Sequence, residues 1–335
     1  MDRLVTVFGA SGFVGNNVVR LLARAGWRIR AAVRNPHLER AEGLRVHGVV
    51  GQIDVMAANI RKPESVHAAL DGAEAVVNCV GVLFERGRQR FTALHAQGAK
   101  NLAQAAADYG IEQLVHISAI GADPTSASRY ARSKAEGEAA VLAATPSATI
   151  LRPSVVFGQE DQFFNRFGAM AAVAPALPLI GGGRTRFQPV YVGDVARAVV
   201  AALGDASARG RTYELGGPKI YTFREVLELV LRETGRSRPL LPLPFFAARA
   251  IGTVADVFTP ILPFDPPLTR DQVELLRRDN VADPALPGLQ ALGITPTAPE
   301  GIIDSYLYRY RKAGQFSTIT PDKSASAGDA SPSRA

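Results

Sequence analysis

Two side chains able to exchange protons stand four residues apart near the middle of the chain. Tyr130 and Lys134 belong to a segment, 129–144, that is predicted to be helical. Residues four apart share one face of a helix, so the Lys134 ammonium can lower the pKa of the Tyr130 phenol and can also bind a ribose. Ser118 ends an earlier predicted strand and can orient a carbonyl. The same spacing is common on solvated helices, so the three candidate catalytic residues indicate a site without proving a reaction.

A glycine-rich turn follows the first predicted strand and opens the first predicted helix. Glycines there allow a tight turn and a close backbone approach to a pyrophosphate, and the helix N-terminus supplies free N–H groups and partial positive charge. This context predicts a dinucleotide site, although an unrelated α/β fold can also use a glycine turn. The residues expected to contact the cofactor here are Gly9, Ser11, Gly12, Phe13, Val14 and Gly15.

The end of the second predicted strand indicates which cofactor is bound. An acidic residue there would hold the ribose 2′-hydroxyl of NAD, whereas an arginine would pair with the 2′-phosphate of NADP. Arg34 occupies this place, and no acidic residue occurs between Asp2 and Glu39. The sequence therefore predicts NADP(H), with solvated surface charge as the alternative role of Arg34.

Later strand ends supply further candidate contacts to the cofactor. Asn59 and Ile60 stand where a strand-end aspartate often contacts adenine. Cys79 and Gly81 end the fourth predicted strand, where small residues let a cofactor approach.

The elements that must position these residues alternate along the chain. Short apolar runs predict strands near 5–8, 28–33, 53–57, 75–80, 114–118 and 149–155, and helices are predicted near 13–25, 63–69, 92–109 and 129–144. Strands that are apolar throughout are typical of a parallel sheet covered on both faces. We therefore predict an α/β fold with a doubly wound parallel Rossmann sheet over residues 1–157, to which segments near 185–216 return. A smaller α/β lobe is expected over 158–312, and a disordered tail over 313–335.

Composition excludes several classes of protein. With 335 residues, of which 47% are hydrophobic and 21% charged, the chain can build a packed core. The single cysteine excludes an intrachain disulfide, and the five histidines lack ligand spacing, so we expect no metal site. The net charge of +7 favours anionic partners, but the arginines are scattered and no recognition motif accompanies them, so nucleic acid is not expected.

The first strand begins so early that we expect no targeting peptide and hence a cytoplasmic protein. The most apolar stretch, 240–268, is broken by six prolines and carries charged residues, so it is not expected to span a membrane.

Several segments resemble those of the short-chain dehydrogenases. The GxxGxxG spacing of the turn is typical of that superfamily, and residues 97–102, 150–154 and 189–196 resemble landmarks of its extended and atypical members, although His95 stands where asparagine is common. This resemblance implies that Pro153 lies by the nicotinamide. More specific segments are similar to the NADPH-binding accessory subunit of respiratory complex I; they are SRYARSK (128–134), FGQEDQFFN (157–165), residues 188–192, LPLPFF (241–246) and LTRDQVE (268–274).

The likeness to this accessory subunit covers about residues 3–312 and implies what the protein does. The nucleotide would be mainly a structural ligand, the partners would be complex I subunits, and the second lobe would lie near the quinone region, peripherally on the inner face of the respiratory membrane. The segment 243–258 fits an interface, because Phe246, Ala250, Val254 and Phe258 can form one stripe, but a helix packed on the core is an equal alternative.

Two other functions remain open. Intact Ser118, Tyr130 and Lys134 favour an NADPH-dependent reductase or epimerase-like enzyme, which could serve ubiquinone biosynthesis. The third hypothesis is a regulator that senses redox state by binding NADPH and signals by contact with a partner.

Overall fold

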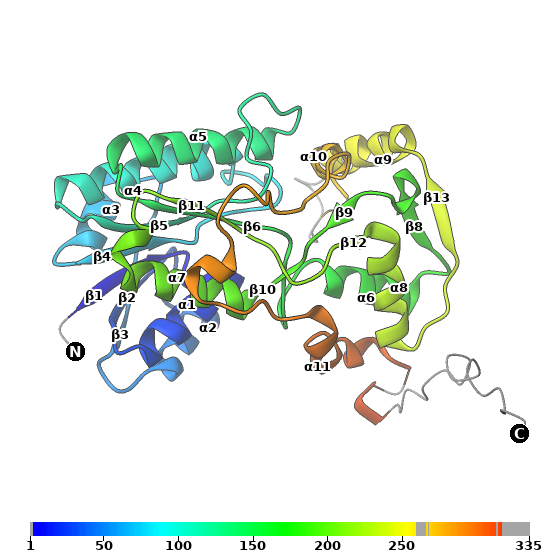
Figure 1. Ribbon diagram of the computed structural model, residues 1–335, viewed down its shortest axis with the longest axis horizontal. Helices are drawn as coiled ribbons and strands as arrows, with labels where there is room; N and C mark the ends of the chain where they lie inside the picture. The colour runs from blue at the N-terminus through cyan, green and yellow to red at the C-terminus, as the bar shows by residue number, and fades with distance from the viewer. Residues whose placement is uncertain (1–2, 259–265, 267, 313, 317–335) are drawn as a thin grey trace, which may run out of the picture.

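The computed structural model describes residues 3–258, 266, 268–312 and 314–316. A larger lobe built on one sheet lies beside a smaller lobe (Figure 1). The sheet contains seven strands in the order β11-β6-β5-β4-β1-β2-β3, and all of its neighbouring strands are parallel. The strands are β1 (Leu4–Phe8), β2 (Arg28–Val33), β3 (Ile53–Ala57), β4 (Ala75–Asn78), β5 (Gln113–Ile117), β6 (Thr149–Pro153) and β11 (Thr212–Leu215).

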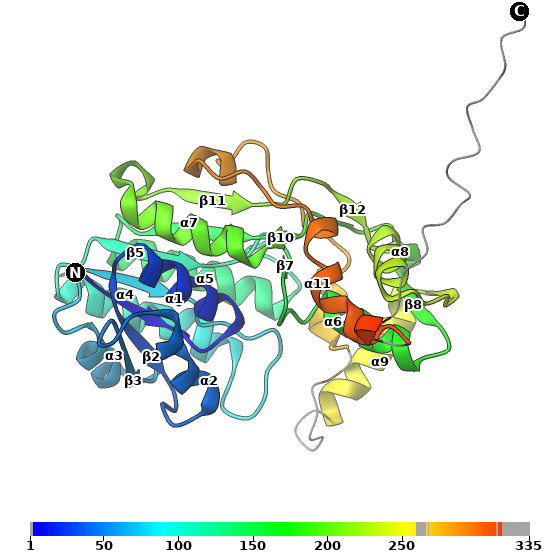
Figure 2. The same cartoon turned by 90° about the horizontal axis from the view of Figure 1, so that it is seen from below.

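Helices cover both faces of this sheet. One face carries α3 (Pro63–Leu70), the π-helical turn η2 (Thr92–Ala96), α4 (Gln97–Asp108) and α5 (Arg129–Ala144), and the other carries α1 (Phe13–Arg24) and α7 (Val192–Gly204). Helices α1 and α7 lie side by side (Figure 2). A short helix, α2 (Glu39–Glu42), follows β2. The predicted doubly wound parallel sheet is confirmed.

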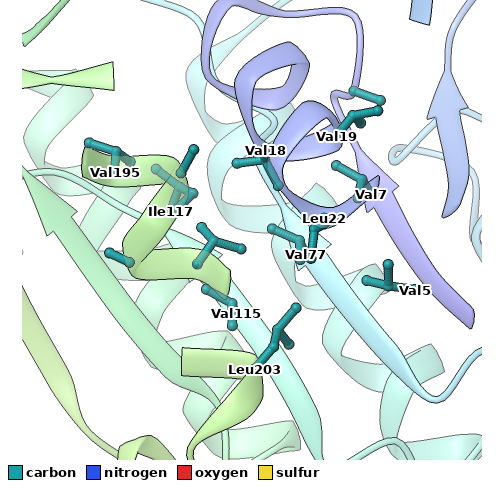
Figure 3. Close-up of a cluster of buried hydrophobic side chains, with 14 of the residues drawn as sticks. Val5, Val7, Val18, Val19, Leu22, Val77, Val115, Ile117, Val195 and Leu203 are labelled. Atoms are coloured by element: carbon teal, nitrogen blue, oxygen red, sulfur yellow. The ribbon is translucent and has the colours of Figure 1, made fainter. Parts of the chain in front are cut away.

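A hydrophobic core lies between the sheet and helices α1 and α7. Side chains from β1, β4 and β5 interdigitate with side chains from the two helices, as Figure 3 shows for the group Val5, Val7, Val18, Val19, Leu22, Val77, Val115, Ile117, Val195 and Leu203. All ten side chains are buried. Their burial packs α1 and α7 against the sheet.

The smaller lobe consists of short strands and helices around two aromatic-rich cores. Its elements are β7 (Val156–Phe157), α6 (Phe164–Val173), β8 (Leu177–Ile180), β9 (Arg186–Phe187), β10 (Val190–Tyr191), β12 (Tyr221–Thr222), α8 (Phe223–Thr234), β13 (Leu240–Leu243), α9 (Phe245–Phe258), α10 (Arg270–Leu275) and α11 (Asp304–Leu307). Helix α8 begins with a capping box formed by Thr222 and Glu225 and ends at Gly235, which has a φ of 59°. None of the described helices is long and apolar enough to cross a bilayer.

Asp161, in the FGQEDQFFN segment, links several parts of the smaller lobe by hydrogen bonds. Its buried carboxylate accepts hydrogen bonds from the N–H groups of Gly158, Phe163 and Asn165 at 3.1, 2.9 and 3.1 Å. It also accepts the hydroxyl of Tyr306 at 2.6 Å. These hydrogen bonds therefore fix the turn before α6 and attach Tyr306 of the C-terminal region to it.

The chain crosses between the lobes more often than we predicted. Residues near 192–215 return to the sheet, with β11 paired to β6. A second return was not predicted: Leu289 and Ile294 are buried in the core beside α7, within the range that we assigned to the smaller lobe. The predicted tail lies outside the described residues except Gly314–Phe316, which form a 3-10 turn.

Candidate functional site

The candidate residues gather along the carboxyl edge of the sheet. They follow β1 to β6, whose parallel arrangement brings all six carboxyl ends to one side. The chain reverses its direction of strand addition between β1 and β4, and ligands of open α/β sheets bind outside the carboxyl ends at such a switch point.

The glycine turn has the geometry of a phosphate cradle. Gly9 has a φ of 76°, which favours glycine, and no side chain caps α1 at Gly12. A Cβ atom on Gly15 would overlap the carbonyl oxygen of Gly9, so glycine is required where helix crosses strand. The first N–H groups of α1 are thus presented at the mouth of the turn. Ser11, Phe13 and Val14 are half-buried around it.

Arg34 lines a surface hollow of about 350 Å³ beyond β2 and β3. The hollow is also lined by Asn59, Lys62, Glu64 and Ser65. Arg34 and Lys62 are both exposed, so the hollow carries two cations that can meet a phosphate. Lys62 was not identified from the sequence, because it follows the expected adenine contacts and the direction of its side chain depends on how α3 starts.

Asn59 and Ile60 are placed differently from each other. The Asn59 side chain lines the hollow, and its Oδ1 accepts hydrogen bonds from the N–H and Nε of Arg61 at 3.2 and 3.3 Å. Ile60 is 4% exposed and its side chain packs in the core under α4. Its carbonyl accepts a hydrogen bond from Asn101 at 3.1 Å. The Ile60 side chain and carbonyl therefore serve the fold, whereas Asn59 lines the hollow.

Cys79 and Gly81 also play different parts. The Cys79 side chain packs against the core, and burial raises its pKa to about 12, so it remains a thiol. Gly81 is exposed, and a Cβ there would lie 3.8 Å from Nζ of Lys134. The exposed Gly81 backbone therefore lies near the Lys134 ammonium, and without a side chain it leaves room for a cofactor to approach.

Ser118 and Lys134 form a buried polar group under α5. Nζ of Lys134 donates to the carbonyl of Ile117 at 2.9 Å, and burial lowers the pKa of Lys134 to about 8. Ser118 is 3% exposed, and its Oγ has no hydrogen-bond partner within the described part of the chain. A buried hydroxyl without a partner is expected where a ligand supplies the missing bond.

Tyr130 lies half-buried between aromatic rings. Its ring meets those of Phe91 and His95 edge-on, with centroids 5.7 and 5.4 Å apart. Burial, and to a lesser extent the Asp271 carboxylate, raises the pKa of the phenol to about 12. In this arrangement the phenol holds its proton at neutral pH.

Asp271 lies at the site but was not singled out from the sequence. Its carboxylate accepts hydrogen bonds at the start of α5 from the Ser128 hydroxyl at 2.7 Å and from the N–H groups of Arg129 and Tyr130 at 2.6 and 3.1 Å. A carboxylate at a helix N-terminus is favourable, because it satisfies free N–H groups and opposes their partial positive charge. Its only signal in the sequence was its place in the LTRDQVE segment.

Pro153 completes the edge of the sheet. It ends β6, and its carbonyl accepts a hydrogen bond from the N–H of Ile120 at 3.0 Å. The residues fit a dinucleotide: they supply a glycine cradle for the pyrophosphate, cations beyond β2 and β3, and a buried hydroxyl without a partner and a buried ammonium beyond β5.

Comparison with known proteins agrees with this geometry. Residues 5–216 match the model of the NAD dependent epimerase/dehydratase family. The mitochondrial NADH dehydrogenase (ubiquinone) 1 alpha subcomplex subunit 9 of Arabidopsis thaliana is 38% identical over 331 residues, which cover 96% of this chain and 81% of the relative. A ceramide reductase of Caulobacter vibrioides is 29% identical over 76% of this chain and 78% of the relative.

The solved structures show the same fold. An NADPH-dependent quinone oxidoreductase from Escherichia coli, solved with NADPH, has a TM-score of 0.71 at 21% identity, covering 91% of this chain and 99% of that one. At this identity the likeness supports the fold alone. The family match and the Arabidopsis thaliana relative, which aligns over 96% of this chain, show two things. The chain belongs to the NAD dependent epimerase/dehydratase family and, within it, to the alpha subcomplex subunit 9 branch of NADH dehydrogenase (ubiquinone).

Proposed function

We propose that this protein is an NADP(H)-binding accessory or assembly subunit of respiratory complex I that holds its nucleotide mainly as a structural ligand. The likeness to subunit 9 along 96% of the chain supports the partnership, since it includes the smaller lobe, where dehydrogenases diverge. A ligand bound only by the folded state stabilises that state without any reaction.

The observation that carries the structural role is the contact between Asp271 and the start of α5. Proton transfer by Tyr130 would require its phenol to ionise readily, which calls for a nearby cation. Here burial, and to a lesser extent the Asp271 carboxylate, raises the pKa of the phenol. The hydrogen bonds of Asp271 stabilise the start of the helix that carries Lys134, and the raised pKa disfavours ionisation of Tyr130.

A surface for partners is offered by α9. Phe246, Ile251 and Val254 are 77, 50 and 57% exposed, and Ala250 is exposed beside them. The side chain of Phe258, the last member of the predicted stripe, lies outside the described residues. Apolar exposure on one helix is typical of a face covered by a partner or by a membrane surface. We infer that this face meets complex I near its quinone region, peripherally on the inner face of the respiratory membrane.

Deletion and complementation test the proposal. We expect deletion of the gene to lower the amount of assembled complex I, and a Tyr130→Phe copy to restore it, because this change removes one hydroxyl and keeps the ring. Lys134→Ala should restore less, because it removes a charge-assisted contact to the nucleotide. The protein should also copurify with complex I subunits from native membranes.

A reductase is the second candidate function. Ser118, Tyr130 and Lys134 are all present at the carboxyl edge, and a curated relative is named a ceramide reductase. If a Tyr130→Phe copy folds and binds NADPH but behaves like the deletion, the reductase replaces the accessory subunit as the better account.

A further inference from the structure

His95 is turned into the protein by an irregular piece of helix. The π-helical turn η2 directly precedes α4 and carries His95, which is 2% exposed. Its carbonyl presses against α5 so closely that a Cβ on Gly137 would overlap it. Such turns are rare and are frequently found at functional sites.

The His95 ring makes one hydrogen bond from each nitrogen. Nε2 accepts the N–H of Val82 at 3.1 Å, so the ring proton lies on Nδ1, which donates to Oγ of Ser133 at 2.9 Å. The Ser133 hydroxyl in turn donates to the carbonyl of Tyr130 at 2.8 Å. The ring therefore connects the loop after β4 to the first turn of α5.

The same ring also packs against the site. It stacks on Phe91 with centroids 5.5 Å apart and meets the ring of Tyr130 edge-on. A Cβ on Gly81 would lie 3.7 Å from Nε2 of His95, so the ring lies directly behind the exposed Gly81 backbone. Burial, with the nearby charge of Lys134, lowers the pKa of His95 to about 2, so the ring is neutral and keeps this pattern of donor and acceptor.

These contacts all belong to one half of the site. A dinucleotide whose pyrophosphate lies on the turn after β1 extends one nucleoside toward β2 and β3, and the other toward β4 and β5. Arg34 and Lys62 lie on the first side, whereas Gly81, Lys134 and every partner of His95 named above lie on the second.

We propose that His95 is a positioning residue for the nicotinamide-ribose half of the nucleotide site. It holds the backbone at Gly81 and Val82 and the first turn of α5 at a fixed separation, without touching the adenosine half. This inference rests on the proposed binding of NADP(H).

Calorimetry with two ligands tests it. NADPH spans both halves, whereas 2′,5′-ADP occupies only the adenosine half. We expect His95→Leu to weaken NADPH binding about ten-fold and to leave 2′,5′-ADP binding within about two-fold, because two buried hydrogen bonds are lost on one side only. His95→Gln keeps one donor and one acceptor and should recover most of the affinity. The matched control is His67→Gln on α3, which should change neither affinity.

The outcomes separate this inference from the function beneath it. Equal weakening of both ligands would mean that His95 serves only the fold, and no weakening of NADPH would mean that it positions nothing; either result overturns the inference while NADP(H) binding stands. Wild-type protein that binds neither ligand would overturn both. If His95→Leu does not fold, Ser133→Ala breaks the same link more gently, and it should weaken NADPH about three-fold with 2′,5′-ADP unchanged.

Discussion

The carboxylate of Asp271, in the smaller lobe, accepts a hydrogen bond at 3.1 Å from the backbone N–H of Tyr130, in the larger lobe. Helix α10 thus caps the helix that carries the candidate catalytic pair. Asp256 of α9 in turn accepts the N–H of Arg270 at the start of α10, also at 3.1 Å. Packing supports this contact, since a Cβ on Gly252 would lie 2.7 Å from the backbone nitrogen of Arg270. A continuous path of contacts therefore joins α9 to α5 through α10.

We expect Asp271→Ala to destabilise the protein and to alter Tyr130. Losing a charged cap that accepts three hydrogen bonds should lower the free energy of unfolding by about 1–3 kcal/mol, measured by urea denaturation. The pKa of Tyr130 is raised to about 12 mainly by burial and secondly by Asp271, so it should fall part of the way toward its ordinary value of 10.0 when this negative charge is removed. Phenolate absorbance during a pH titration, compared with Tyr130→Phe, would show this shift.

The matched control is Asp54→Ala, which changes an exposed carboxylate on β3. It should leave the unfolding free energy within about 0.5 kcal/mol of the wild type. A loss of the same size in both variants would show that the cap at α5 has no special importance.

Substitutions of Gly12 and Gly15, the last two glycines of the turn, should separate an effect on stability from an effect on nucleotide binding. Gly15→Val forces a side chain onto the backbone of Gly9, so we expect both folding stability and NADPH binding to be lost. A Cβ on Gly12 would lie 3.2 Å from the Gly9 oxygen and face outward, so Gly12→Val should fold but obstruct the pyrophosphate. Thermal unfolding and calorimetry on both variants measure this. Wild-type NADPH affinity in either one would mean that the turn does not bind phosphate.

Local patterns in the sequence predicted most of the larger lobe. The predicted helix 129–144 and the predicted strand 28–33 match α5 and β2. Apolar runs and the glycine turn act within a few residues, so they can be recognised in the sequence. The predicted helix 92–109 is helical over residues 92–108, but residues 92–96 form a π-helical turn, which lies against Gly137 and was not predicted.

Contacts between distant residues were not predictable in this way. Asp271 meets Ser128 across 143 positions of the chain, and the return of Leu289 to the core depends on the docking of a loop on α7. Lys62 precedes α3 by one residue, and only the folded structure shows that its side chain shares a hollow with Arg34. Each of these depends on tertiary geometry that no local periodicity encodes.

Both cations of the hollow should contribute to the choice of cofactor. We expect Arg34→Ala to reduce the preference for NADPH over NADH by about ten-fold or more, because a bidentate contact to the 2′-phosphate is lost. Lys62→Ala should reduce it less, since an exposed ammonium is a weaker and more mobile partner. Calorimetry with both cofactors measures the preference. Arg28→Ala, at the opposite end of β2, is the control and should leave it unchanged.

Equal affinities of the wild-type protein for the two cofactors would contradict this assignment. A preference that falls in Lys62→Ala but not in Arg34→Ala would reverse the order of importance and place the phosphate nearer α3. Salt should weaken NADPH binding more than NADH binding, because the additional contact is between charges.

The buried ammonium of Lys134 should make nucleotide binding and stability respond to alkaline pH in opposite directions. Burial lowers its pKa to about 8 from 10.5 in the unfolded chain, so above pH 8 the unfolded state holds more protons than the folded one. Stability without nucleotide should therefore rise between pH 8 and 10.5, by up to about 3 kcal/mol. A bound anionic nucleotide favours the charged form, so NADPH affinity should fall over the same range, by up to about ten-fold per pH unit.

Lys134→Met isolates this effect, because it keeps the aliphatic stem and removes the charge. Differences between wild type and variant cancel the titration of other groups, such as Cys79 and Tyr130, whose pKa values are raised to about 12. Urea denaturation from pH 7 to 10 should show a rise in stability in the wild type that is absent from the variant, and calorimetry should show a fall in affinity absent from it. If both proteins follow one pH profile, Lys134 is not the group that links the nucleotide to the proton, and its contact with Ile117 serves the fold alone.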